Sequence, residues 1–203
     1  MTDKTGTRTL QLPHPLVPEN VSLGKVLETR HSIRKFSDEP LSQEDLATLL
    51  WAGYGVRDDG RRTVPSAVAF YGLQLFVVVG EVRRIDSGIY SWNPQTNGLN
   101  LMSSGDLRFQ LQKATSGQEV VADAPATLVF AASEKYGERF GDRGEAFAAN
   151  EVGFSVQNTL LTAVALGLGA VPVGGFSASE VADSLGIQGS GKPYLLVPVG
   201  HPA

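Results

Sequence analysis

The alternation of apolar and polar positions predicts one long helix over residues 145–168 as the centre of this protein. No proline interrupts it, and apolar residues occupy nearly every side of its helical wheel, so we expect a central, buried helix. Gly167, Gly169 and Pro172 end the apolar run before it reaches the ~20 residues of a membrane span. Its alanines permit close packing of another helix, either from this chain or from a second copy.

Three serines stand directly before shorter amphipathic runs, where N-caps are expected: Ser22, Ser42 and Ser177. We expect the second of these helices to end at Gly53 and Gly55. Residues 106–125 predict one or two further amphipathic helices with a break at Gly117.

Continuous β-branched and aromatic runs predict buried strands at residues 73–79 and 126–132. Residues 87–102 predict a hairpin with a turn near Asn97, and residues 194–200 predict a last strand. Residues 30–36 alternate in polarity, as a half-exposed strand does. Helices and strands follow no regular β-α-β period, which favours an α+β fold over a doubly wound sheet.

Length and charge limit the domain organisation and the kinds of partner that this protein can have. The 203 residues suit an extended N-terminal segment, 1–20, followed by a single domain, 21–203. A net charge of −4 without a basic block argues against nucleic acid and membrane partners, and no signal segment is apparent, so we expect a soluble cytoplasmic protein. The absence of cysteine and the wide spacing of His14, His31 and His201 predict no metal site.

The candidate chemistry begins with Arg30, Ser32 and Arg34, which share one face of an extended segment. They could be a solvated edge, or they could form an anion clamp for phosphate, to which the planar guanidinium is well matched. No nucleophile elbow, P-loop or dinucleotide fingerprint is present. If the protein is an enzyme, we therefore expect a bound cofactor to carry its chemistry.

Five blocks in order cover most of the chain: RHSIRKF, PSAVAFYGLQLFVVV, APATLVFAA, the stretch from NEVGF to VPVGGF, and LLVPVGHP. Together they resemble the FMN-dependent nitroreductase family. The further blocks LQLPHP, LLWAGYGV and GIYSWNP look most like its SagB-type dehydrogenase branch. The resemblance implies an α+β fold with a mixed sheet flanked by helices around the long buried helix. It also implies an entwined homodimer that holds two FMN molecules, each touched by both chains.

The resemblance assigns cofactor contacts residue by residue. Arg30, Ser32 and Arg34 fit contacts to the phosphate, the ribityl chain and the pyrimidine edge, and His31 could add backbone or ring atoms. The remaining positions are Pro65 and Ser66, which would reach the flavin of the opposite subunit, then Gln118, Gly174 and Gly175. The backbone N–H of Gly175 would act catalytically near flavin N5, where glycine lets the backbone approach a planar ligand.

The sequence departs from the family in two respects. Many relatives carry an acidic residue at the position of Gly174, and many carry a phosphate-binding Lys or Arg in a C-terminal tail. Arg139 or Arg143 could replace that tail residue, or Arg30 and Arg34 could suffice.

The implied activity is an FMN-dependent oxidoreductase that takes hydride from NAD(P)H and passes electrons to a nitroaromatic or quinone-type acceptor. An alternative is a SagB-type flavin dehydrogenase that oxidises azoline-like substrates. A third possibility, of another class, is a non-catalytic FMN-binding protein.

Overall fold

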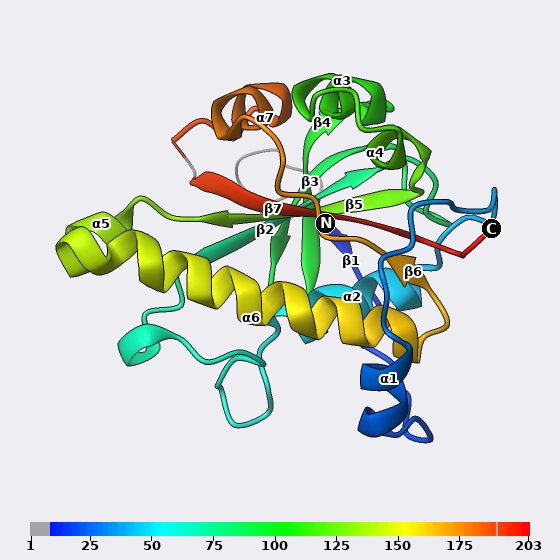
Figure 1. The fold of residues 1–203 in the computed structure, drawn as a ribbon, viewed down its shortest axis with the longest axis horizontal. Coiled ribbons are helices and arrows are strands. Elements are labelled where there is room, and N and C mark those ends of the chain that lie inside the picture. The colour runs from blue at the N-terminus through cyan, green and yellow to red at the C-terminus, as the bar shows by residue number, and fades with distance from the viewer. Residues whose placement is uncertain (1–8, 190) are drawn as a thin grey trace.

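A computed structural model describes residues 9–189 and 191–203. Its described strands form a seven-stranded sheet in the order β1-β4-β3-β2-β5-β7-β6 (Figure 1). The strands are β1 Thr9–Gln11, β2 Leu73–Val79, β3 Gly88–Asn93, β4 Gly98–Ser104, β5 Ala126–Ala132, β6 Gly169–Ala170 and β7 Lys192–Gly200. The predicted buried strands, the hairpin and the last strand are confirmed. The expected mixed sheet is wrong, because every described ladder is antiparallel.

Helices cover both faces of this sheet. The helices are α1 Leu23–Thr29, α2 Gln43–Tyr54, α3 Arg108–Ala114, α4 Glu119–Asp123, α5 Lys135–Phe140, α6 Gly144–Ala165 and α7 Ala178–Leu185, with short 3-10 turns at Ala67–Ala69 and Gly141–Arg143. In Figure 1, α6 crosses one face together with α2, while α3, α4 and α7 lie on the other. Because both faces are covered, the sheet has a hydrophobic core on each side. The side chains of β2 alternate between them: Leu75 and Val77 pack into one core, and Phe76 and Val78 pack into the other. The α+β fold is therefore confirmed.

The serine caps form as predicted. The side chains of Ser22, Ser42 and Ser177 accept hydrogen bonds from backbone N–H groups three residues on, at 3.1, 2.9 and 3.4 Å. Each cap satisfies one of the N–H groups that a helix start leaves without a partner.

Helix α6 differs from its predicted all-round burial. It ends at Ala165, and Gly167 follows in the left-handed conformation with φ 74°. One side of α6 packs on the sheet and on α2, but Phe154 on the other side is 48% exposed. A helix that lies on the face of a sheet buries the side that meets the sheet, and within the described chain Phe154 on the other side remains largely uncovered.

The segment 30–36 does not form the predicted strand. Its Ile33 N–H donates one hydrogen bond to the carbonyl of Ala170 at 3.1 Å, and further along Phe36 forms a single antiparallel bridge with Pro202, but no continuous ladder follows. Strand β6 is only two residues long, so it offers too short an edge for continued pairing. A Cβ on Gly169 would lie 2.6 Å from the Ile33 side chain, which shows how closely the segment approaches β6.

Gly53 also differs from its predicted role, because it lies inside α2 and only Gly55 forms the C-cap. A Cβ on Gly53 would come within 2.7 Å of Thr159 Oγ1, so glycine permits α2 and α6 to cross closely. Helix α6 in turn satisfies the last carbonyls of α2. Ser155 Oγ donates to the Gly53 carbonyl at 2.6 Å, and Asn158 Nδ2 donates to that of Ala52 at 3.3 Å.

Of the N-terminal segment, residues 9–11 add β1 to the edge of the sheet beside β4, and Leu12 packs into the core. Residues 1–8 of that segment lie outside the described residues.

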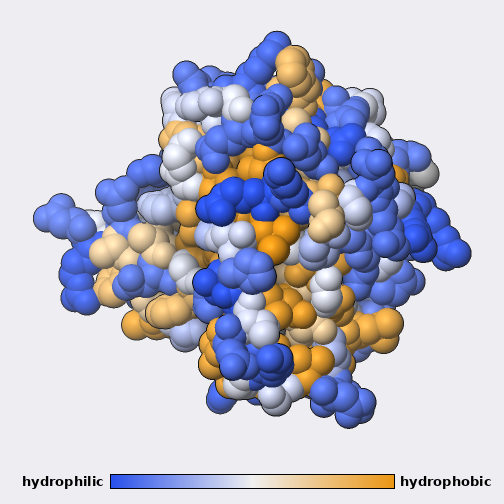
Figure 2. Space-filling model, turned by 45° about the vertical axis from the view of Figure 1, so that its right-hand side comes forward, coloured by the Kyte–Doolittle hydropathy of each residue, from blue (hydrophilic) through white to orange (hydrophobic). Residues whose placement is uncertain are grey.

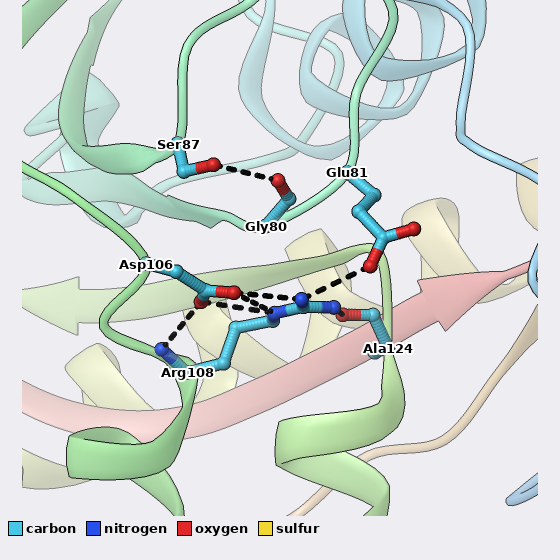
Figure 3. A network of polar contacts seen from close by, with 6 residues as sticks. All are labelled: Gly80, Glu81, Ser87, Asp106, Arg108 and Ala124. Atoms are coloured by element: carbon cyan, nitrogen blue, oxygen red, sulfur yellow. Dashed lines mark hydrogen bonds and ion pairs between the residues drawn. The ribbon is translucent and has the colours of Figure 1, made fainter.

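Next to the end of β2 and the start of β5, Arg108 joins three parts of the chain (Figure 3). Its guanidinium donates to the carboxylates of Asp106 and Glu81, at 2.7 and 3.1 Å, and to the Ala124 carbonyl at 3.3 Å. The hydrogen bonds from Arg108 lower the pKa of Asp106 below its usual range. Gly80 makes room for this group, since a Cβ there would lie 2.1 Å from Arg108 Nε. Arg108 is therefore an arginine fully engaged in holding the fold.

Candidate functional site

Two arginines near β6 contrast with Arg108. Arg30 is half-buried at the C-cap of α1, and Arg34 is exposed. Neither guanidinium makes a hydrogen bond or an ion pair with any residue in the described part of the chain. A guanidinium binds phosphate through paired N–H groups, and the N–H groups of both arginines remain available to a ligand.

Between the two arginines, His31 is exposed and places its ring Nδ1 2.9 Å from the carbonyl oxygen of Thr29. Ser32 is half-buried, and its hydroxyl has no partner among the described residues. The segment therefore offers an unused hydroxyl beside two unused cations.

The loop that follows β6 carries Gly174 and Gly175, both exposed. The Gln118 side chain reaches this loop, because its Nε2 donates to the Gly175 carbonyl at 3.1 Å and to the Thr115 carbonyl at 3.2 Å. The structure thus brings together Gln118 and Gly175, which the family resemblance assigned to the same cofactor. The carbonyl Oε1 of Gln118 is left to accept a hydrogen bond from a ligand.

Nothing within the described chain requires glycine at position 175. Its φ is not in the left-handed region, and a Cβ there would meet no atom within 4 Å. Its backbone N–H donates to no described residue. The bare backbone is therefore open to a ligand, which is the environment that a close approach to a flat molecule needs.

The two groups of residues lie at one edge of the sheet. Ile33 is hydrogen bonded to Ala170, and the four residues from there to Gly174 span at most ~14 Å even when extended. The Arg30 to Arg34 segment and the loop that carries Gly174 and Gly175 thus flank the same edge strand, β6.

Pro65 and Ser66 lie elsewhere. Ser66 Oγ donates to the carboxylate of Glu151, in the first half of α6. From Glu151 to Ala165, where α6 approaches β6 and the arginines, the helix axis extends about 21 Å at 1.5 Å per residue. One chain therefore does not bring Ser66 to Arg30. Arg143, considered above as a phosphate ligand, precedes α6 and stacks on Phe147, at the far end of the helix from Arg30.

Glu151 itself is a functional candidate that sequence reasoning missed. Its side chain is only 1% exposed and accepts hydrogen bonds from the hydroxyls of Tyr54, at 2.8 Å, and Tyr136, at 2.7 Å, as well as from Ser66. Burial and the nearby Glu151 carboxylate raise the pKa values of Tyr54 and Tyr136 far above the usual range, so both phenols keep their protons.

A signal for this carboxylate was present in the sequence. Glu151, Ser155 and Thr159 recur at a spacing of four within an apolar helix, which places three polar groups on one side. All three are buried against α2 or its neighbours. A polar stripe inside an apolar helix indicates buried hydrogen bonds, although its partners cannot be read from the helix alone.

A separate cleft of about 690 Å³ lies between the N-terminal segment, the end of α2 and the β3–β4 turn. Trp51 and Trp92 line it together with Asp58 and Asp59. None of the residues that the family resemblance assigned to the cofactor lines this cleft.

Comparison with known proteins decides the family. The sequence profile of the nitroreductase family matches residues 27–201. The chain belongs to the nitroreductase family. A nitroreductase homologue from Methanocaldococcus jannaschii is 37% identical over 197 residues, which cover 96% of this chain and 97% of that protein. This nitroreductase-family membership makes the chain an oxidoreductase by class.

Solved structures show the same fold. A nitroreductase homologue from Ralstonia eutropha superimposes with a TM-score of 0.85 at 30% identity, over 97% of this chain and 90% of that chain. A more distant homologue from Desulfovibrio desulfuricans, solved in complex with FMN, gives a TM-score of 0.65 at 22% identity, over 88% and 85% of the two chains. Within the described part of this nitroreductase-family chain, no helix combines the length and apolar character that a bilayer crossing requires.

Proposed function

We propose that this nitroreductase-family protein binds FMN and is an FMN-dependent oxidoreductase. When bound, FMN would accept hydride from NAD(P)H and pass electrons to a small oxidised acceptor of the nitroaromatic or quinone type. The observation that carries the proposal is that the guanidiniums of Arg30 and Arg34 and the N–H of Gly175 have no partner among the described residues and lie at the same edge of the sheet.

The residues present fit FMN by their chemistry. Arg30 and Arg34 supply two cations for one phosphate, and the Ser32 hydroxyl is unused. At the other end of the site, the N–H of Gly175 and the Oε1 of Gln118 supply one donor and one acceptor to a flat polar ring. These groups would bind the two ends of the cofactor and orient its ring, which is what a protein contributes to flavin chemistry.

The distribution of the site residues supports a homodimer. Ser66 lies about 21 Å along α6 from the arginines of its own chain, so a site that uses both would need a second copy. In this proposal, two FMN molecules lie at the interface. Pro65 and Ser66 of each chain then meet the FMN that is bound by the partner subunit's Arg30.

Exposed apolar side chains support the same interface. Figure 2 shows apolar patches on the lower part of the surface. In and near α1 the exposed apolar side chains are Leu16, Val17, Val21, Leu23 and Leu27, and α6 adds Phe154. An apolar groove of about 200 Å³ lies among them, between the N-terminal segment, α1, α2 and the end of α6. Contiguous apolar patches of this kind mark contact surfaces, and a second copy would cover the side of α6 that one chain leaves open.

A second candidate is a SagB-type dehydrogenase that oxidises azoline-like substrates. Three sequence blocks favour it: LQLPHP, LLWAGYGV and GIYSWNP. In the fold the first and the last form one unit, since β1 of the LQLPHP block pairs with β4 of the hairpin that begins GIYSWNP. A non-catalytic FMN-binding protein is less well supported, because Gly174 and Gly175 are exposed and a store would seal its cofactor.

The test begins with the colour of the purified protein. We expect flavin absorbance, and release of FMN into the filtrate after denaturation, because the chain has no cysteine for a thioether link. Oxidation of NADH or NADPH with a nitroaromatic or quinone acceptor would then support the reductase. Flavin reduction by an azoline-containing peptide, without NAD(P)H, would favour the dehydrogenase. A protein that stays colourless when FMN is added would refute the proposal.

A further inference from the structure

The buried carboxylate of Glu151 has an unusual set of partners. Both of its oxygens are used, because Tyr54 donates to Oε1 while Tyr136 and Ser66 donate to Oε2. No cation forms an ion pair with it in the described part of the chain. The guanidinium of Arg62 instead stacks on the Tyr54 ring, with its central carbon 4.8 Å from the ring centre. Three hydroxyl donors therefore replace the water that the carboxylate loses on burial.

The same three hydroxyls hold three consecutive backbone N–H groups. Ser66 Oγ accepts from Tyr71 N at 2.8 Å, Tyr136 OH from Gly72 N at 3.3 Å, and Tyr54 OH from Leu73 N at 3.1 Å. Each hydroxyl thus donates to Glu151 and accepts from the chain just before β2. One carboxylate orients three hydroxyls, and the hydroxyls fix the loop from Ser66 to Leu73.

This loop is strained. Val68, Ala69 and Tyr71 have φ values of 45°, 55° and 52°, in the left-handed region that favours glycine. For a β-branched residue such as Val68 this conformation is an outlier, and it persists only where surrounding contacts determine it. Val68 is also 75% exposed, so packing within the described chain does not explain why the loop adopts this shape.

We infer that Glu151 is a positioning residue, which holds the strained loop from Ser66 to Leu73 in the shape that meets the FMN of the partner subunit. The inference rests on the proposed function. It also assigns a different role to Ser66, whose hydroxyl is already occupied as a donor to Glu151 and as an acceptor from Tyr71. The Ser66 side chain is therefore an anchor for the loop, and the loop contacts the cofactor through its backbone and through neighbouring residues such as Pro65.

The first measurement compares Glu151→Gln with wild type. The amide replaces one of the two accepting oxygens by an NH2 group, so at least one of the three hydroxyls loses its acceptor and the negative charge is removed with little change in size. We expect FMN to bind roughly tenfold or more weakly, as for the loss of one charge-assisted contact, in fluorescence titrations of the apoprotein. Glu145→Gln is the matched control. Glu145 lies on the same helix, is exposed, and among the described residues its carboxylate pairs with Lys192 alone. The Glu145→Gln variant should therefore bind FMN as wild type does.

A second measurement separates positioning across the interface from general loss of structure. Heterodimers are purified with two affinity tags, in two arrangements. In the first, one chain carries Arg30→Ala and the other Glu151→Gln. If Glu151 serves the partner subunit's FMN, one site then carries both defects and the other none, so one FMN per dimer should bind with wild-type affinity.

In the second arrangement, one chain carries both substitutions and the other is wild type. Each site then has one defect, and no site should show wild-type affinity. Equal FMN binding in the two arrangements, or the reverse order, would overturn the inference. If Glu151→Gln does not fold, Tyr136→Phe removes a single hydroxyl of the network and enters the same two arrangements.

The outcomes also separate this inference from the proposed function. A wild-type protein that binds FMN, with Glu151→Gln binding equally well, would overturn the role of Glu151 and leave the proposed function standing. A wild-type protein that does not bind FMN would overturn both.

Discussion

Replacement of Arg30 or Arg34 by alanine tests the centre of the proposed site. In the described chain neither guanidinium has a hydrogen bond or ion pair to lose, so the fold of the apoprotein should keep its stability. A phosphate held by each arginine would lose a charge-assisted contact of about 1.5–3 kcal/mol. That loss corresponds to roughly 10- to 150-fold weaker FMN binding for each single variant.

The double variant should lose less than the sum, because both arginines would contact one phosphate and neighbouring groups are not additive. Apoprotein is titrated with FMN while flavin fluorescence is followed, and the unfolding temperature of the apoprotein is measured in parallel. Higher salt should weaken wild-type binding more than binding by the variants, since screening acts on the charges that the variants lack.

Arg83→Ala is the matched control. It removes the same charge from an exposed pair with Glu39, 3.3 Å away. We expect this variant to bind FMN as wild type does. If Arg30→Ala and Arg34→Ala also bind FMN as wild type does, or if they lower the unfolding temperature while affinity is unchanged, the residues 30–34 are a solvated segment and the phosphate clamp is wrong.

Three further predictions concern the fold and the dimer. Gly53→Ala should lower the free energy of unfolding in urea by about 1–3 kcal/mol, because its Cβ would lie 2.7 Å from Thr159 Oγ1; overpacking should outweigh the ~1 kcal/mol helix-propensity gain, and a stabilised variant would contradict this. Asp106→Asn should cost about 0.5–1 kcal/mol at neutral pH, since the pair with Arg108 is partly exposed. Because Arg108 lowers the folded pKa of Asp106, this stabilisation is present above the unfolded pKa and is lost as pH falls through the folded value, so wild type and variant should converge in acid. Phe154→Asp should weaken dimerisation in sedimentation experiments by at least the ~1.5–3 kcal/mol of a buried phenylalanine, and it should release FMN as well; an unchanged dimer would place the interface elsewhere.

The amino-acid sequence by itself determined the parts of this fold that depend on neighbouring residues. Serine caps, the strands at 73–79 and 126–132, and the break at Gly117 all follow from local rules, and the structure contains each of them. The family could also be recognised, because its motifs occur in order along the chain. Local hydrogen bonding and side-chain periodicity suffice for such features, since all the atoms involved lie within a few residues.

Tertiary structure decided the features whose partners are distant in sequence. The alternating segment 30–36 is not a strand, because the edge it meets at β6 is too short to pair with it. Gly53 does not end its helix, since it serves the crossing with α6, more than a hundred residues away. Glu151 is buried only because Tyr54, Ser66 and Tyr136 converge on it from three separate parts of the chain. A helical wheel shows which side of a helix is apolar, but it does not show which residues cover that side. The covering residues depend on the whole fold and, for the outer face of α6, on a second chain in the proposed dimer.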